Sequence, residues 1–171
     1  MKKIEQYNLT NERMIDAFDK LVIKKNGKPF SVDDICKEAN IHHQTFYHHF
    51  NSREDFINYI VEKKLKDLYS IMNKNGNYIS TFCKCFIEIS KHQRQILSKY
   101  LKLEEFKAKF NNDATILLDF AISKEYNFIN NEAKVFIIGG IIEYLKFSII
   151  NNNFDNFETN LFNIINKLTN N

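Results

Sequence analysis

The stretch of the chain richest in groups that could do chemistry is IHHQTFYHHF, residues 41–50. It holds four histidines, a glutamine, a threonine and a tyrosine, and no acidic residue. Imidazoles can ligate a metal or carry protons, and together with hydroxyl and amide groups they can form hydrogen bonds to another molecule. Three kinds of site therefore have to be compared: a metal centre, a catalytic cluster and a binding surface.

The spacing of the histidines argues against a metal centre. His43 and His48 are five residues apart and do not share one helical face, and no Asp, Glu or Cys in the stretch completes a coordination shell. A catalytic Cys–His or Ser–His pair stays open, but the chain contains no glycine-rich phosphate loop and no known nucleophile motif. We expect no cofactor and no metal, and we expect that the protein is not an enzyme.

Local signals place the stretch on the second of two short helices. Ser31 and Asp34 have the spacing of a capping box that starts the first helix. Asn40 tolerates the left-handed backbone of a tight turn, and the second helix is predicted over about His43 to His49. Two short helices joined by such a turn form a helix-turn-helix, whose second helix usually enters the major groove of DNA.

The helical phase of residues 43–49 separates a buried side from an outward side. Phe46 and Phe50 lie four residues apart and are expected to face the core. The side chains then turned outward are His43, Gln44, Tyr47 and His48, with Thr45 near the edge. Their donors and acceptors are of a size that reaches base edges and phosphates.

The rest of the sequence predicts an all-α fold. An apolar stripe predicts a helix that starts with Thr10 as its N-cap and ends before Asn26, with Gly27 left-handed. A long helix is predicted from Ser52 to about Met72, followed by a break at residues 73–77. No segment alternates with a period of two. The remaining helices are expected over about 78–90, 92–101, 103–124, 131–151 and 155–168.

Composition limits the classes of function. The net charge is only +3, and residues 1–66 carry 12 Lys/Arg against 10 Asp/Glu, so bulk charge does not indicate a nucleic-acid binder. The three cysteines give no disulfide framework or zinc spacing, and Cys83 and Cys85 are interpreted as isolated thiols. The longest apolar run, residues 135–142, is too short to span a bilayer. We expect a cytoplasmic protein with no membrane contact.

The segment FSVDDICKEANIHHQTFYHHFNSREDF, preceded by RMIDAFDKLVIKKNGK, resembles the DNA-binding domain of TetR-family transcriptional regulators. It is most similar to a branch whose recognition segment reads QTFYxHF and which includes regulators of dihydroxyacetone-kinase operons. The resemblance implies a helix-turn-helix domain over residues 8–66 and a C-terminal helical region over residues 67–171, for dimerisation and possibly for an effector.

The resemblance also implies which residues meet double-stranded DNA. Gln44 and Thr45 would contact base edges, while Tyr47, His48 and Arg53 would contact phosphates. Backbone amides at the N-terminus of the first short helix would add a phosphate contact. The full implied set is Ser31, Val32, His42, His43, Gln44, Thr45, Tyr47, His48 and Arg53. His42 and His43 replace the usual serine and lysine. Because His42, His43 and His48 would all lie near phosphates, DNA affinity is expected to rise as pH falls from about 8 to about 6.

The last two predicted helices resemble the pair through which the family dimerises. Gly139 and Gly140 interrupt a helix that is apolar on nearly every side, which favours close approach of a partner helix. We expect a homodimer and therefore a palindromic operator. The apolar residues assigned to this interface are Phe136, Gly140, Ile141, Tyr144, Phe147, Leu161, Ile164 and Leu168.

The function implied is sequence-specific control of transcription, as a repressor released by an unknown effector. The alternative is a helical regulator or co-activator that works through a protein partner. By analogy with the family, a small-molecule effector would lie among the helices from about 78 to 124, although the aromatic residues there are more simply core. Those aromatic residues are Phe82, Phe86, Tyr100, Phe106, Phe110 and Phe120.

Overall fold

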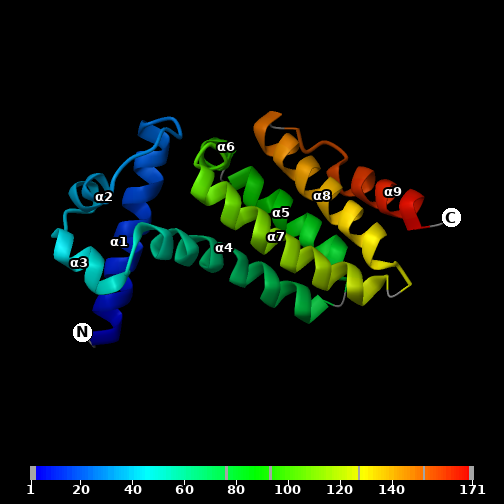
Figure 1. The fold of residues 1–171 in the computed structure, drawn as a ribbon, viewed down its shortest axis with the longest axis horizontal. Coiled ribbons are helices and arrows are strands. Elements are labelled where there is room, and N and C mark those ends of the chain that lie inside the picture. Colours follow the sequence, from blue (N-terminus) through cyan, green and yellow to red (C-terminus); the bar gives the residue numbers. More distant parts are fainter. Residues whose placement is uncertain (1–2, 76, 93, 127, 152, 170–171) are drawn as a thin grey trace.

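The computed structural model describes the chain except for residues 1–2, 76, 93, 127, 152 and 170–171. The described residues form helices and no strand, so the all-α prediction is confirmed. Figure 1 shows α1, α2 and α3 together at one end, with the long α4 leading from them towards the C-terminal helices. The helices are α1 (Lys3–Lys24), α2 (Val32–Ala39), α3 (His43–His49), α4 (Arg53–Asn75), α5 (Tyr78–His92), α6 (Arg94–Tyr100), α7 (Glu104–Glu125), α8 (Asn131–Asn151) and α9 (Phe157–Thr169).

The first helix begins earlier than predicted. It starts at Lys3, and Thr10 lies inside it instead of capping it. The Thr10 hydroxyl donates to the carbonyl of Gln6 at 3.0 Å, a bond that a threonine makes within a helix. The prediction was wrong because residues 3–9 contain no proline or glycine, so a favourable cap residue at position 10 did not stop the helix from extending.

The local signals around α2 are confirmed. The Ser31 hydroxyl accepts from the amide of Asp34 at 3.2 Å, and the Asp34 carboxylate accepts from the amide of Ser31 at 2.9 Å. That backbone hydrogen bond, and next the Lys25 ammonium, lower the pKa of Asp34 to about 2. Asn40 ends α2 with φ 51° and ψ 55°, the left-handed conformation that the turn to α3 requires.

The helices enclose two apolar cores. One lies under α1 to α4 and is centred on Phe18, Phe46 and Phe56, while the other joins α5, α7, α8 and α9. The first core also includes Tyr100 of α6 and Phe106 of α7. The proposed domain boundary near residue 66 falls inside α4, and the core of the N-terminal end draws on helices well beyond it.

Tyr100 is the main link between α6 and α1. Its ring is fully buried and stacks on Phe106 at 4.2 Å and on Phe18 at 5.7 Å between ring centroids. Its hydroxyl donates to the carboxylate of Asp19. Burial, and then the nearby Asp19 charge, raise the pKa of Tyr100 far above its usual value, so the phenol stays a hydrogen-bond donor at any physiological pH.

The loop between α1 and α2 lies directly against α6. Gly27 has φ 75°, and a Cβ added there would lie 2.5 Å from the carbonyl oxygen of Lys99 and 3.0 Å from Lys102. Glycine is therefore required here for two reasons. Its backbone is left-handed, and the backbone at Lys99 approaches too closely to leave room for a side chain.

We expect Gly27→Ala to destabilise the fold by about 2 kcal/mol, because alanine is strained at this φ and its Cβ would push against the Lys99 carbonyl. The urea midpoint of unfolding measures the change. Lys28→Ala, at the exposed neighbouring position, is the control and should leave the midpoint nearly unchanged. Equal midpoints for the two variants would contradict the close approach of this loop to α6.

Candidate nucleic-acid interface

The outward face of α3 is polar, as the helical phase predicts. Phe46 is fully buried and Phe50 is 6% exposed, so both anchor α3 on the N-terminal core. Tyr47 is 47% exposed and Thr45 is half-buried. The exposed polar side chains of this segment are His42, His43, Gln44 and His48. The fold thus presents hydroxyl, amide and imidazole groups on one protruding short helix, which is the arrangement that reads DNA in a helix-turn-helix.

Two of the groups in the expected DNA-binding set already have partners within the chain. The Nε2 atom of His43 lies 3.0 Å from Oδ1 of Asp33, which joins α3 to α2. The amide of Ser31 donates to Asp34 within the capping box. A phosphate would have to compete with Asp33 for His43 and with Asp34 for the Ser31 amide.

Arg53 also differs from its expected role. Its Nε donates to the carboxylate of Glu105 on α7 at 2.8 Å, and its guanidinium lies over the ring of Phe30 at 4.8 Å from the ring centroid. Its side chain is only 20% exposed. Glu105, an exposed residue of α7, thereby holds the first residue of α4. Arg53 can reach a phosphate only by leaving this carboxylate.

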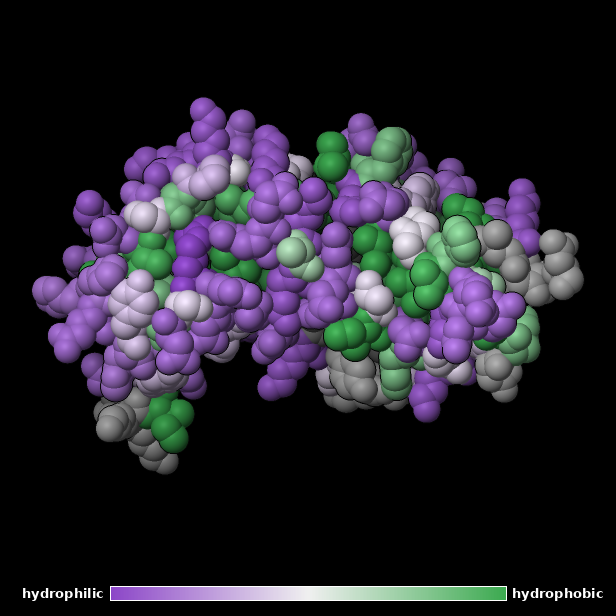
Figure 2. Space-filling view, in the orientation of Figure 1, coloured by the Kyte–Doolittle hydropathy of each residue, from purple (hydrophilic) through white to green (hydrophobic). Residues whose placement is uncertain are grey.

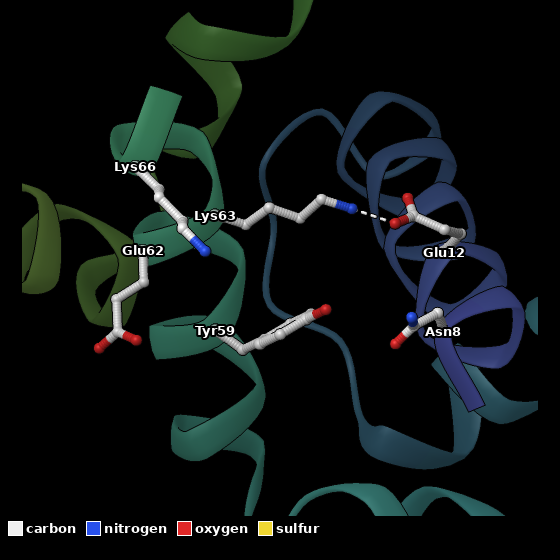
Figure 3. Close-up of a pocket in the computed structure, with 6 residues that line it drawn as sticks. All are labelled: Asn8, Glu12, Tyr59, Glu62, Lys63 and Lys66. Carbon is white, nitrogen blue, oxygen red and sulfur yellow. Dashed lines mark hydrogen bonds and ion pairs between the residues drawn. The ribbon is translucent and has the colours of Figure 1, made fainter. Parts of the chain in front are cut away.

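Behind the recognition helix, a cleft of about 540 Å³ separates α1 from α4. Figure 3 shows Lys63 reaching across it to Glu12, with the Tyr59 hydroxyl pointing from α4 towards α1. The lining residues are Asn8, Glu12, Tyr59, Glu62, Lys63 and Lys66. Sequence reasoning missed this cleft because its two walls lie about fifty residues apart and no local pattern connects them.

The described residues offer little for other chemistry. No three His, Cys, Asp or Glu side chains among them come together in a way that could hold a metal ion. Cys36 and Cys83 are buried, and burial raises the pKa of both thiols, that of Cys83 to about 12. Such thiols are poor nucleophiles. In the part of the chain that the structure describes, no helix has the length and apolar character needed to cross a bilayer.

A capped α2, a left-handed turn and a short α3 with a polar outward face form a helix-turn-helix, an arrangement that binds DNA in many proteins. Comparison with known families agrees. Residues 15–60 match the family described as "Bacterial regulatory proteins, tetR family". The match covers the helix-turn-helix region only, so residues 15–60 are similar to the DNA-binding domain of TetR-family transcription regulators.

Two curated relatives match part of the chain. An uncharacterized HTH-type transcriptional regulator, YwcC of Bacillus subtilis (strain 168), is 42% identical over 55 residues, which are 32% of this chain and 25% of that protein. The HTH-type dhaKLM operon transcriptional activator DhaS of Lactococcus lactis subsp. lactis (strain IL1403) is 31% identical over 70 residues, 41% of this chain and 36% of that protein. The likeness therefore spans about a third or less of each relative.

Removing the Glu105 carboxylate should release Arg53 for DNA. We expect Glu105→Gln to steepen the dependence of log affinity on log salt concentration by about 0.9, the increment for one added phosphate contact. Binding to a random DNA duplex, followed by fluorescence anisotropy at several salt concentrations, measures the slope. Glu104→Gln is the matched control, because it removes the same charge from the neighbouring exposed position. Identical slopes in both variants would show that Arg53 gains no phosphate.

Proposed function

We propose that the protein is a cytoplasmic, sequence-specific transcription regulator that binds double-stranded DNA through α3 as a homodimer. The observation that carries this proposal is the surface of α3, where Phe46 and Phe50 are buried while four polar side chains are exposed: His43, Gln44, Tyr47 and His48. A short helix with this division can enter a major groove without disturbing its own core.

Within this proposal, the outward residues of α3 have separate roles. The Gln44 amide and the Thr45 hydroxyl and methyl groups suit base edges, while Tyr47 and His48 suit phosphates. His42 and His43 lie at the start of α3, where His43 must exchange Asp33 for DNA. At the start of α2, the Val32 amide is the proposed phosphate donor, because Ser31 uses its own amide within the cap.

An apolar face on the C-terminal helices supports the dimer. Figure 2 shows hydrophobic side chains gathered over these helices, while the surface over the N-terminal end is mostly hydrophilic. On α8, Phe136 is 81% exposed and Phe147 is 56% exposed, and a Cβ at Gly140 would meet nothing within 4 Å. An exposed apolar face of this kind is typical of a protein interface.

The proposed dimer interface contains fewer residues than the interface predicted from the sequence. Ile141 and Leu161 are buried in the core of their own chain, so they cannot contribute to an exposed face. Ile164 on α9 is 41% exposed and stays in the set, and Tyr144 is half-buried. The side chain of Leu168 lies outside the described part of the chain.

Two regulatory readings remain within the proposal. The first is a repressor released by an effector. The aromatic residues considered for an effector pocket are divided between the two cores, since Phe82 packs in the C-terminal core and Tyr100 and Phe106 pack under α1. The side chain of Phe86 is not among those described.

The second reading is activation, with or without a protein partner, and it is supported by the relative that is named a transcriptional activator. A reporter fused to the bound promoter distinguishes the two by the sign of its response.

If α3 reads DNA, Thr45→Ala and Tyr47→Ala should each weaken binding to a selected operator by about tenfold, because each removes a contact worth on the order of 1–3 kcal/mol. Their melting temperatures should stay close to that of wild type, since neither side chain is fully buried. Selection from random DNA, followed by anisotropy titrations, gives both the operator and the affinities. Thr115→Ala on α7 is the control. A selected consensus without inverted half-sites would contradict the dimeric reading.

A charge placed in the apolar face should dissociate the dimer. We expect Gly140→Glu and Ile164→Lys to convert the protein to a monomer at micromolar concentration, as measured by sedimentation, because a buried unpaired charge is strongly unfavourable. Ile116→Lys provides the control, since Ile116 is 61% exposed on α7 and lies outside this face. A wild-type protein that sediments as a monomer would rule out the proposed assembly.

DNA binding should take up protons at α3. Phosphates favour the protonated form of an imidazole, so operator affinity should rise several-fold as the pH falls from about 8 to about 6 at fixed ionic strength. His48 is the main candidate, because His43 already lies beside Asp33. His48→Gln should remove most of the pH dependence and keep a hydrogen-bonding side chain. Equal pH dependence in wild type and variant would show that His48 does not carry the effect.

A further inference from the structure

The side chain of His49, the last residue of α3, points back from the recognition helix to α1. Its Nδ1 atom lies 2.6 Å from the amide oxygen of Asn11. The ring of Tyr7 stacks on the imidazole at 4.0 Å between centroids, with 15° between the planes, and the Tyr7 hydroxyl donates to the His49 carbonyl at 3.4 Å. Asn11 is only 4% exposed, so a buried amide, an aromatic face and a hydroxyl all meet the end of α3.

The contact between His49 and α1 fixes the rotation of α3 about its own axis, which the apolar anchors of α3 leave free. Phe46 and Phe50 hold the helix against the core, but apolar packing is non-directional and permits small rotations. The His43–Asp33 pair at the other end is exposed on both sides, so it contributes little. The bond between His49 and Asn11 is directional and partly shielded from water, and it therefore restricts how α3 turns about its axis.

The protonation state of His49 agrees with this arrangement. The Asn11 oxygen can only accept, so Nδ1 carries the hydrogen. Burial, and next the neighbouring His48, lower the pKa of His49, which keeps the ring neutral near pH 7. The Asn11 amide nitrogen in turn donates to the Tyr59 hydroxyl of α4 at 3.5 Å, so Asn11 lies between the recognition helix and the wall of the α1–α4 cleft.

The residues that hold His49 lie outside the part of the chain that matches the TetR family, which begins at residue 15. Both belong to the first half of α1. We propose that Tyr7 and Asn11 are positioning residues that set the orientation of the recognition helix through His49, and thereby determine operator specificity without contacting DNA. This inference rests on the proposed function, because it concerns how α3 reads DNA.

The test compares specific with non-specific binding. Asn11→Leu keeps the volume and burial of the side chain but removes the acceptor for His49. The ratio of affinity for the selected operator to affinity for random DNA should fall by about tenfold, while random-DNA affinity and its salt slope stay unchanged. Base contacts need precise placement, whereas phosphate contacts tolerate a small rotation of α3. Asn8→Ala is the matched control, since Asn8 lies three residues earlier on α1 and faces the cleft in Figure 3.

A second variant separates positioning from a general effect on the fold. Asn11→Asp keeps an acceptor oxygen at the same place, so the specificity ratio should return to within about twofold of wild type. The added carboxylate should also raise the pKa of His49 above its wild-type value, because it favours the imidazolium. The NMR titration of the His49 ring proton measures this shift in the free protein and tests the contact itself, while the specificity ratio separates positioning from a merely structural role.

The outcomes are distinct when all variants are measured at a temperature where circular dichroism shows them folded. A wild-type protein that selects no DNA sequence would overturn the proposed function. A selective wild type with an unchanged ratio in Asn11→Leu would overturn only the inference about positioning. A parallel loss of specific and random-DNA affinity in Asn11→Leu would also overturn the inference about positioning. So would an unshifted His49 titration in Asn11→Asp.

Discussion

The recognition helix α3 has only seven residues, and a helix of that length cannot hold itself in place in water. Its position is therefore determined by what surrounds it. The capping box at Ser31 and the left-handed Asn40 fix the direction from which the chain enters it. Phe46 holds it against the core, and His49 holds its end against α1. The short helix can present an almost entirely polar surface because its neighbours supply the stability that it lacks.

The neighbours of α3 depend in turn on the C-terminal helices. Phe18, which supports the N-terminal core, stacks on Tyr100 of α6, and the α1–α2 loop leaves no room for a Cβ beside Lys99. Arg53, at the start of α4, is held by Glu105 of α7. The residue range that resembles a DNA-binding domain is thus not a separately closed core. A shift of α6 or the start of α7 changes the packing of α1 and α4, and these two helices frame the recognition helix.

What the sequence could predict was local. The capping box of α2, the turn at Asn40 and the span of α3 depend on residues within a few positions of one another, and all three agree with the structure. The start of α1 was missed because Thr10 has the residue type of a cap. The start of α1 is determined by the whole segment that precedes Thr10. In that segment the ring of Tyr7 packs on His49. The partners of Arg53 and His49 lie 52 and 38 residues away, and no periodicity or spacing connects them.

Ion pairs within the chain bear on how a nearly neutral protein could bind a polyanion selectively. At the DNA-binding end, cationic or protonatable groups already hold carboxylates: Arg53 with Glu105, His43 with Asp33, and Lys25 with Asp34. A phosphate gains from such a group only by replacing a carboxylate, so the net electrostatic gain from these three groups would be small. The proposed hydrogen bonds from Gln44 and Thr45 to base edges would not face this competition, because α3 has no acidic residue in its first turn. If these paired groups contribute little to affinity, recognition by the proposed interface would depend more strongly on the correct orientation of one short helix.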